Sequence, residues 1–160
     1  MKHGKTFVSL LVVGMLVIAA CDQKAPAPAE PKAQQNKKAD CHDEHDHGAG
    51  PPIELGVATA AGFTIKAARD NFPIKPACDA PTDVWITGGS AKVKAVRFWI
   101  GTEDAKGSIK ALAEIENPAE PNHWHTHAEI PDPIPAGSKL WVEVEAEGGA
   151  KGTASFDLKT

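Results

Sequence analysis

Turn-forming residues divide residues 53–160 into short segments in which apolar and polar residues alternate. In Lys139–Glu147, every second residue from Leu140 to Ala146 is apolar, the residues between them are Trp141 and two glutamates, and a third glutamate follows Ala146. Successive side chains of an extended chain point to opposite faces, so this alternation predicts a strand with one buried face. Similar segments recur between glycine, proline and asparagine turns, and none has the period of an amphipathic helix. The pattern predicts an all-β domain, an antiparallel β-sandwich of about eight strands.

The expected strands share this alternation or are rich in β-branched and aromatic residues. In chain order they are Ile53–Ala58, Phe63–Arg69, Val84–Thr87, Lys92–Gly101, Ser108–Glu116, His123–Glu129, Lys139–Glu147 and Gly152–Leu158. In Ser108–Glu116 we expect Ile109, Ala111, Ala113 and Ile115 to point inward. The layout resembles the immunoglobulin or fibronectin type III architecture. Residues 53–160 contain one cysteine, Cys78, so the inter-sheet disulfide of antibody domains is not expected.

Residues 1–20 have the layout of a secretory signal peptide. Two lysines stand near the start, and an apolar run extends from Phe7 to Ala20, too short for a membrane span. The run ends in Ile18-Ala19-Ala20-Cys21, which resembles the lipobox of bacterial lipoproteins. This resemblance implies that the signal is removed and that Cys21 carries lipid. An ordinary cleaved signal with an unmodified Cys21 is the alternative.

The lipoprotein resemblance also implies a location in the cell envelope, facing the periplasm. In enteric bacteria an Asp directly after the acylated cysteine tends to retain a lipoprotein in the inner membrane, and here that residue is Asp22. Without the two signal lysines, the mature chain has 15 basic and 21 acidic residues. This negative charge argues against nucleic acid as a partner.

Residues 21–52 are expected to form a disordered tether, because they are rich in proline and polar residues and lack periodic apolar positions. The tether contains Cys41-His42-Asp43-Glu44-His45-Asp46-His47, a dense group of thiol, imidazole and carboxylate side chains. Short tracts of this composition are typical of metal binding. We therefore take His42, His45 and His47 as candidate ligands; the alternative is a hydrophilic spacer that happens to contain histidines.

A second group of candidate ligands lies on one face of the strand His123–Glu129. Alternation places His123, His125, His127 and Glu129 on the same face. Neighbouring histidines are about 6.8 Å apart along a strand, near enough to share one ion, whereas the outer two are roughly 13 Å apart. The six histidines of the mature chain are divided equally between this strand and the tether. The alternative is the solvated face of an ordinary strand.

Two further expectations concern the surroundings of these groups. If the strand from Lys139 pairs with the histidine strand, Glu143 and Glu145 would lie near His125 and His127, as ligands or as hydrogen-bond acceptors. Charge pairs on a wet sheet are the simpler alternative for both glutamates. Cys41 and Cys78 are expected to form a disulfide in an oxidising compartment, although Cys41 as a thiolate ligand would exclude that bond.

The residue types constrain the metal only partly. The mature chain has no methionine, which argues against a copper(I) carrier of the thioether type, whereas imidazole and carboxylate suit zinc, copper(II) or nickel. The sequence has no catalytic serine elbow and no phosphate-binding glycine loop, so we do not expect an enzyme. We expect a lipid-anchored protein that binds a divalent metal, with zinc favoured, for buffering, sensing or hand-over to a metal transporter. The alternative is an immunoglobulin-like module that binds another envelope protein.

Overall fold

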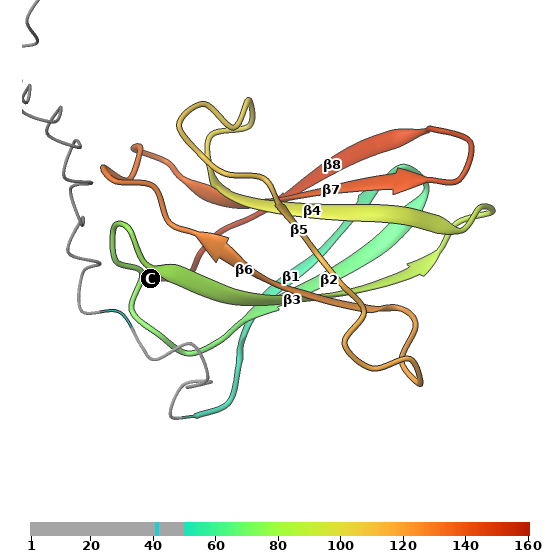
Figure 1. The fold of residues 1–160 in the computed structure, drawn as a ribbon, viewed down its shortest axis with the longest axis horizontal. Helices are drawn as coiled ribbons and strands as arrows, with labels where there is room; N and C mark the ends of the chain where they lie inside the picture. Colours follow the sequence, from blue (N-terminus) through green and yellow to red (C-terminus); the bar gives the residue numbers. More distant parts are fainter. Residues whose placement is uncertain (1–40, 42–49) are drawn as a thin grey trace, which may run out of the picture. The chain divides into compact units, whose positions relative to one another are not determined.

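Two facing antiparallel sheets of four strands make up the computed structural model, which describes residue 41 and residues 50–160 (Figure 1). The strands are β1 (Ile53–Ala60), β2 (Phe63–Arg69), β3 (Asp79–Gly88), β4 (Val93–Gly101), β5 (Ala111–Leu112), β6 (His123–Glu129), β7 (Lys139–Ala146) and β8 (Lys151–Phe156). One sheet has the order β1-β2-β3-β6 and the other β5-β4-β7-β8. The prediction of an antiparallel β-sandwich is confirmed.

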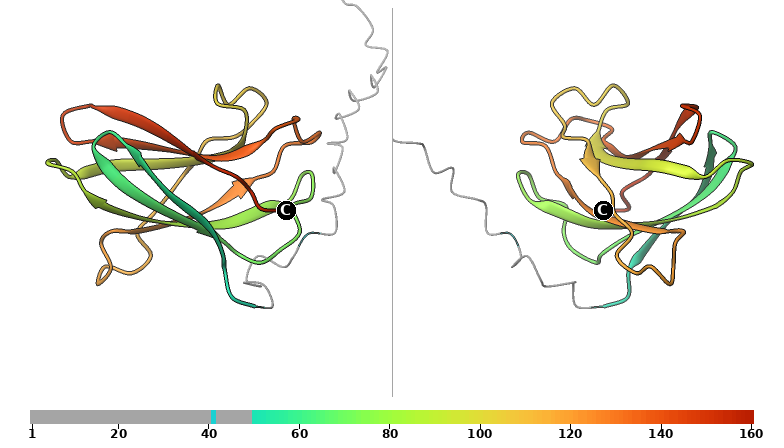
Figure 2. Two further views of the ribbon diagram at one scale, coloured as in Figure 1. Left: turned by 180° about the vertical axis from the view of Figure 1, so that it is seen from behind. Right: turned by 45° about the vertical axis from the view of Figure 1, so that its right-hand side comes forward.

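The strand order also follows the immunoglobulin-like layout. If β1 is set aside, β2, β3 and β6 correspond to strands A, B and E, and β8, β7, β4 and β5 correspond to G, F, C and C′. The additional strand β1 lies beside β8 of the opposite sheet (Figure 2). In the described part of the chain, no helix is long and apolar enough to span a membrane.

The core lies between the two sheets and is built by the alternation predicted from the sequence. The four inward residues of β7 are all buried, and they are Leu140, Val142, Val144 and Ala146. Inward residues of the opposite sheet, such as Ile65 and Val84, belong to the same hydrophobic cluster. Burying a large aliphatic side chain stabilises a fold by roughly 1.5–3 kcal/mol, so these two faces hold the sheets together.

Strand β3 is longer than predicted, because it begins at Asp79 instead of Val84. The predicted strand began only after Pro81, since proline has no N–H to donate to a sheet and the residues up to Pro81 are rich in turn formers. In the structure the carbonyl of Pro81 still accepts a hydrogen bond of 3.0 Å from the N–H of Asp70. The sheet therefore tolerates the proline, and five more residues become part of β3.

The predicted strand Ser108–Glu116 is reduced to the two residues of β5. Ile109, expected to point inward, is 55% exposed, so that prediction is wrong. Ala113 is buried as expected and Ile115 is half-buried. The strand is short because the chain leaves the sheet of β4 almost at once and crosses to the other sheet (Figure 1).

This crossing attaches the chain after β5 to the free edge of β6. The N–H of Ala113 still bonds to the carbonyl of Val96 in β4, at 2.9 Å. One residue later, Glu114 exchanges two backbone hydrogen bonds of 2.9 Å with His125. The acidic segment that follows Glu114 is thereby held beside the histidine strand.

The outer face of the sheet β5-β4-β7-β8 carries a network of ion pairs. Glu145 contacts Lys94 at 2.7 Å, Lys151 at 3.2 Å and Arg97 at 3.3 Å. These hydrogen bonds, with that of Lys94 the strongest, lower the pKa of Glu145 to about 2. Glu143 joins the network through Arg97 at 3.3 Å. Glu143 and Glu145 therefore form ion pairs with lysine and arginine side chains of their own sheet.

Candidate metal site on the outer face of β3 and β6

Strand β6 turns its three histidines away from the core. Trp124 and Ala128 on the other face are buried between the sheets. His123, His125 and His127 are each half-buried on the outer face. The alternation predicted from the sequence is present, and the three imidazoles follow one another along one surface.

The partner of β6 is β3, and not β7, the pairing considered from the sequence. Strand β7 lies in the opposite sheet between β4 and β8. The condition under which Glu143 and Glu145 would lie near His125 and His127 is therefore not met, and both glutamates form the charge pairs expected as the alternative. Consecutive strands of a sandwich often belong to different sheets, and here the proline-rich connection between β6 and β7 crosses from one sheet to the other.

The register between β3 and β6 places Asp83 directly opposite His125. One oxygen of Asp83, Oδ1, lies 2.8 Å from Nε2 of His123 and 2.9 Å from Nδ1 of His125. Burial alone would raise the pKa of Asp83, but the hydrogen bonds and positive charge of the two histidines outweigh this effect and lower it. Asp83 is therefore an ionised acceptor between His123 and His125.

His125 is surrounded by carboxylates. Its hydrogen bond to Asp83 raises its pKa, burial opposes this shift, and the charges of Asp83, Glu116 and Asp70 add to it. The second ring nitrogen of His125, Nε2, lies 3.8 Å from Oε1 of Glu116. Negative charge thus faces both nitrogens of this imidazole, which is an environment suited to a cation.

His123 is fixed differently. Its ring stacks on the indole of Trp85, with ring centroids 4.7 Å apart and an interplanar angle of 9°. Its Nε2 contacts Asp83, and its Nδ1 lies 3.5 Å from Oε2 of Glu120. The Asp83 carboxylate separates His123 from His125, so these two imidazoles do not form a chelating pair as they stand.

His125 and His127 are the pair with chelating geometry. Their ring centroids are 5.4 Å apart, and the ring planes are nearly perpendicular, at 82°. Two imidazoles bound to one tetrahedral zinc ion through bonds of about 2.0 Å have centroids about 5.2 Å apart. The separation of the two rings therefore matches that of two imidazoles that share one ion.

The described residues, as they are arranged in this structure, do not form a complete metal site. Among residue 41 and residues 50–160, no three His, Cys, Asp or Glu side chains are grouped closely enough to hold an ion. Glu129 is exposed at the end of β6, opposite Asp79 in the register. A metal bound by His125 and His127 would need at least one side chain to move or a ligand from elsewhere.

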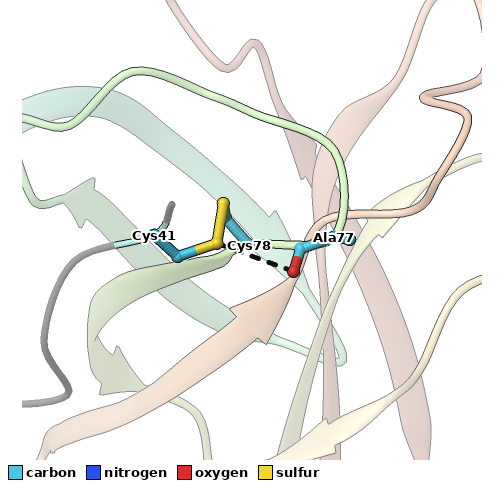
Figure 3. The surroundings of a disulfide bond; sticks show 3 residues. All are labelled: Cys41, Ala77 and Cys78. Atoms are coloured by element: carbon cyan, nitrogen blue, oxygen red, sulfur yellow. Dashed lines mark hydrogen bonds between the residues drawn. A yellow bond between two sulfur atoms is a disulfide. The ribbon is translucent and has the colours of Figure 1, made fainter. Parts of the chain in front are cut away.

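The tether histidines His42, His45 and His47 lie outside the described residues. Cys41, directly before them, is joined to Cys78 by a disulfide bond with a Cα–Cα distance of 5.5 Å (Figure 3). Sγ of Cys41 also lies 3.8 Å from the carbonyl oxygen of Ala77, a contact and not a hydrogen bond, because a disulfide sulfur carries no proton.

The position of Cys78 relates the disulfide to the histidine strand. Cys78 immediately precedes β3, whose first residue, Asp79, pairs with Glu129 at the end of β6. His127 pairs with Pro81, three residues after Cys78. The disulfide therefore attaches Cys41 at the end of the sheet that carries His127.

Sequence reasoning missed the acidic partners of the histidines. Asp83 lay one residue before the predicted strand Val84–Thr87. For this reason it was not recognised that Asp83 and Trp85 share the outer face of the strand. Glu116 and Glu120 were not considered because nothing local indicates that the segment after β5 crosses to β6. A strand prediction that extended through Pro81 would have shown Asp83 on a polar face.

Comparisons with family models, with curated proteins and with solved structures found no match to this chain. The geometry and chemistry of the residues themselves therefore indicate the function. The His125–His127 pair, with carboxylates on both sides of His125, is the arrangement that indicates it best.

Proposed function

We propose that the protein is a membrane-anchored extracytoplasmic lipoprotein that binds a divalent transition metal ion through His125 and His127. The observation that supports this proposal most directly is the 5.4 Å separation of the two imidazole rings. Imidazole with carboxylate suits zinc, and also copper(II) or nickel. Zinc is the metal we favour for buffering, sensing or hand-over to another envelope protein.

The tether histidines follow Cys41, which the disulfide attaches at the end of the sheet that carries His127. Consecutive Cα atoms are about 3.8 Å apart, so His42 cannot be far from Cys41, which is bonded to Cys78. The chain from Cys41 to His47 extends at most about 20 Å. This reach makes transfer of an ion between the tether histidines and His127 geometrically feasible, and it supports a role in capture and hand-over.

We expect a tether-histidine variant, the full mature chain with His42, His45 and His47 changed to alanine, to retain one zinc site. His125→Ala or His127→Ala in this background should weaken zinc binding by at least about tenfold, because each removes one member of the chelating pair. Isothermal calorimetry with zinc chloride measures both effects. Cys41 must be kept, because its removal would leave Cys78 as a free thiol that can itself bind zinc.

His123→Ala is the matched control on the same strand. His123 is held by Trp85 and Asp83 away from the pair, so its removal should change zinc affinity much less.

Binding of zinc should weaken as the pH falls. The loss should begin above the ordinary imidazole pKa of 6.5, because the raised pKa of His125 favours the competing proton. A tether-histidine variant that takes up no zinc would contradict the proposed site and leave the histidines as a polar surface.

The membrane anchor is tested separately at Cys21. Mass spectrometry of the mature protein should find an acylated amino-terminal cysteine, and Cys21→Ala should release the protein from the membrane fraction. The expectation follows from the small residues that precede this cysteine after an apolar run. A mature form that is unmodified and begins at another residue would contradict the anchor without affecting the metal site.

A further inference from the structure

We infer that Glu116 supplies a carboxylate ligand to the ion bound by His125 and His127, and that Asp83 is the positioning residue that directs Nε2 of His125 towards it. This inference rests on the proposed function and names the rest of the same site. Asp83 lies 42 residues before His125 in the sequence, and Glu116 lies nine residues before it. The fold brings both to His125, Asp83 from β3 and Glu116 from the segment after β5.

The backbone holds Glu116 beside His125. Glu114 and His125 exchange two backbone hydrogen bonds, and Glu116 follows two residues later. Oε1 of Glu116 lies 3.8 Å from Nε2 of His125. Two ligands of a tetrahedral zinc ion, with bonds of about 2.0–2.2 Å, are about 3.3 Å apart. The Glu116 side chain is 61% exposed, so it can make the small movement that zinc coordination requires.

Asp83 determines which nitrogen of His125 can bind a metal. An ionised carboxylate only accepts hydrogen bonds, so His125 must donate the N–H of Nδ1 to it, at 2.9 Å. In the neutral imidazole the lone pair is then on Nε2, the nitrogen that faces Glu116. Metal-bound histidines usually donate their other N–H to a carboxylate in this way, which fixes the tautomer and the ring orientation.

The contact between His123 and Glu120 can be compared directly with that between His125 and Glu116. There Nδ1 of His123 faces Oε2 of Glu120 at 3.5 Å, and the Glu120 side chain is 55% exposed. The two histidine–glutamate pairs are therefore alike in distance and exposure. Among residue 41 and residues 50–160, a second imidazole at chelating distance is recorded for His125, that of His127, and not for His123. The ion should lie on the Glu116 side, and Glu120 should contribute little.

The resulting site has two imidazole ligands and one carboxylate ligand. Zinc sites with three protein ligands keep a fourth position open for water or another ligand. Such a site releases its ion to an incoming ligand more readily than a closed site of four protein ligands, which suits an exchangeable zinc or copper(II) ion.

The test uses the tether-histidine variant and zinc chloride alone as the probe. Glu116→Gln should weaken zinc binding by at least about tenfold, since losing a ligand should cost no less than losing an orienting partner. Glu120→Gln, the matched control, should change affinity by no more than about twofold. Asp83→Asn should weaken binding by about 10- to 100-fold. Thermal unfolding of each variant checks that the fold is retained.

Nitrogen-15 NMR of the imidazoles tests the positioning role without any substitution. At alkaline pH and before zinc is added, His125 should carry its proton on Nδ1, and Asp83→Asn should shift it towards a mixture of tautomers. A proton on Nε2 in the unsubstituted protein would overturn the role of Asp83, even if Asp83→Asn failed to fold. So would an Asp83→Asn protein that keeps the Nδ1–H tautomer and yet loses affinity.

The outcomes separate this inference from the proposed function. If the tether-histidine variant binds no zinc, the proposed function fails, and this inference fails with it. If that variant binds zinc and Glu116→Gln leaves the affinity unchanged, or Glu120→Gln weakens it more, the ligand assignment is overturned while metal binding by His125 and His127 stands.

Discussion

Replacing Arg69 with alanine is expected to lower the free energy of unfolding by about 3 to 5 kcal/mol. Arg69, at the end of β2, is only 3% exposed. Its guanidinium donates four hydrogen bonds of 2.7–3.0 Å to the carbonyls of Asp70, Phe72, Leu158 and Lys159. Alanine would remove all four donors at once and release the chain after β8 from β2.

Urea denaturation of the two proteins measures this loss, and Lys66→Ala on the same strand is the control. Lys66 is exposed and pairs with Glu54 at 2.9 Å, so its removal should cost less than about 1 kcal/mol. Arg69→Lys should also lower the free energy of unfolding, because an ammonium group has three donors and lacks the planar fork of the guanidinium. A loss below about 1 kcal/mol for Arg69→Ala would show that water replaces the guanidinium easily.

Removing the disulfide is the second change with a large expected effect. The Cys41→Ala/Cys78→Ala double variant should lose about 4 kcal/mol of unfolding free energy, because the bond closes a loop across a sequence separation of 37 residues. Cys78 is buried in the core, so both cysteines are replaced to avoid leaving a buried thiol. Denaturation with and without a reducing agent measures the effect.

The double variant supplies its own control, because a reducing agent should destabilise the natural protein and leave the variant unchanged. Thiol counting on the unreduced, unfolded protein should find neither Cys41 nor Cys78 free. Two free thiols there would contradict the bond. In that case Cys41 would be available as a thiolate beside the tether histidines.

The fold was largely predictable because the strand signal is local. Alternation along β7 predicted which residues are buried, and the same pattern on β6 predicted that the three histidines share a face. The errors occurred where a contact between residues distant in sequence overrode the local sequence pattern. Pro81 hid the start of β3, and the alternation of Ser108–Glu116 continued through a segment that leaves one sheet for the other.

The site was less predictable, because its partners come from strand pairing. Adjacency in sequence suggested that β7 accompanies β6, which would have brought Glu143 and Glu145 to the histidines. The structure pairs β6 with β3 and with Glu114, and so brings Asp83 and Glu116 to them. The choice between sheets depends on how two apolar faces bury each other, and no short stretch of sequence carries that information.

The sequence by itself determined that residues 53–160 form a β domain and that His123, His125 and His127 line one strand face, and it predicted a signal segment before them. These features follow from composition and from the two-residue period of an extended chain. Only the tertiary structure decided that Asp83 separates His123 from His125 and leaves His125 and His127 as the pair. The physical reason is register, since the pairing of β3 with β6 places residues some 40 positions apart within hydrogen-bond distance.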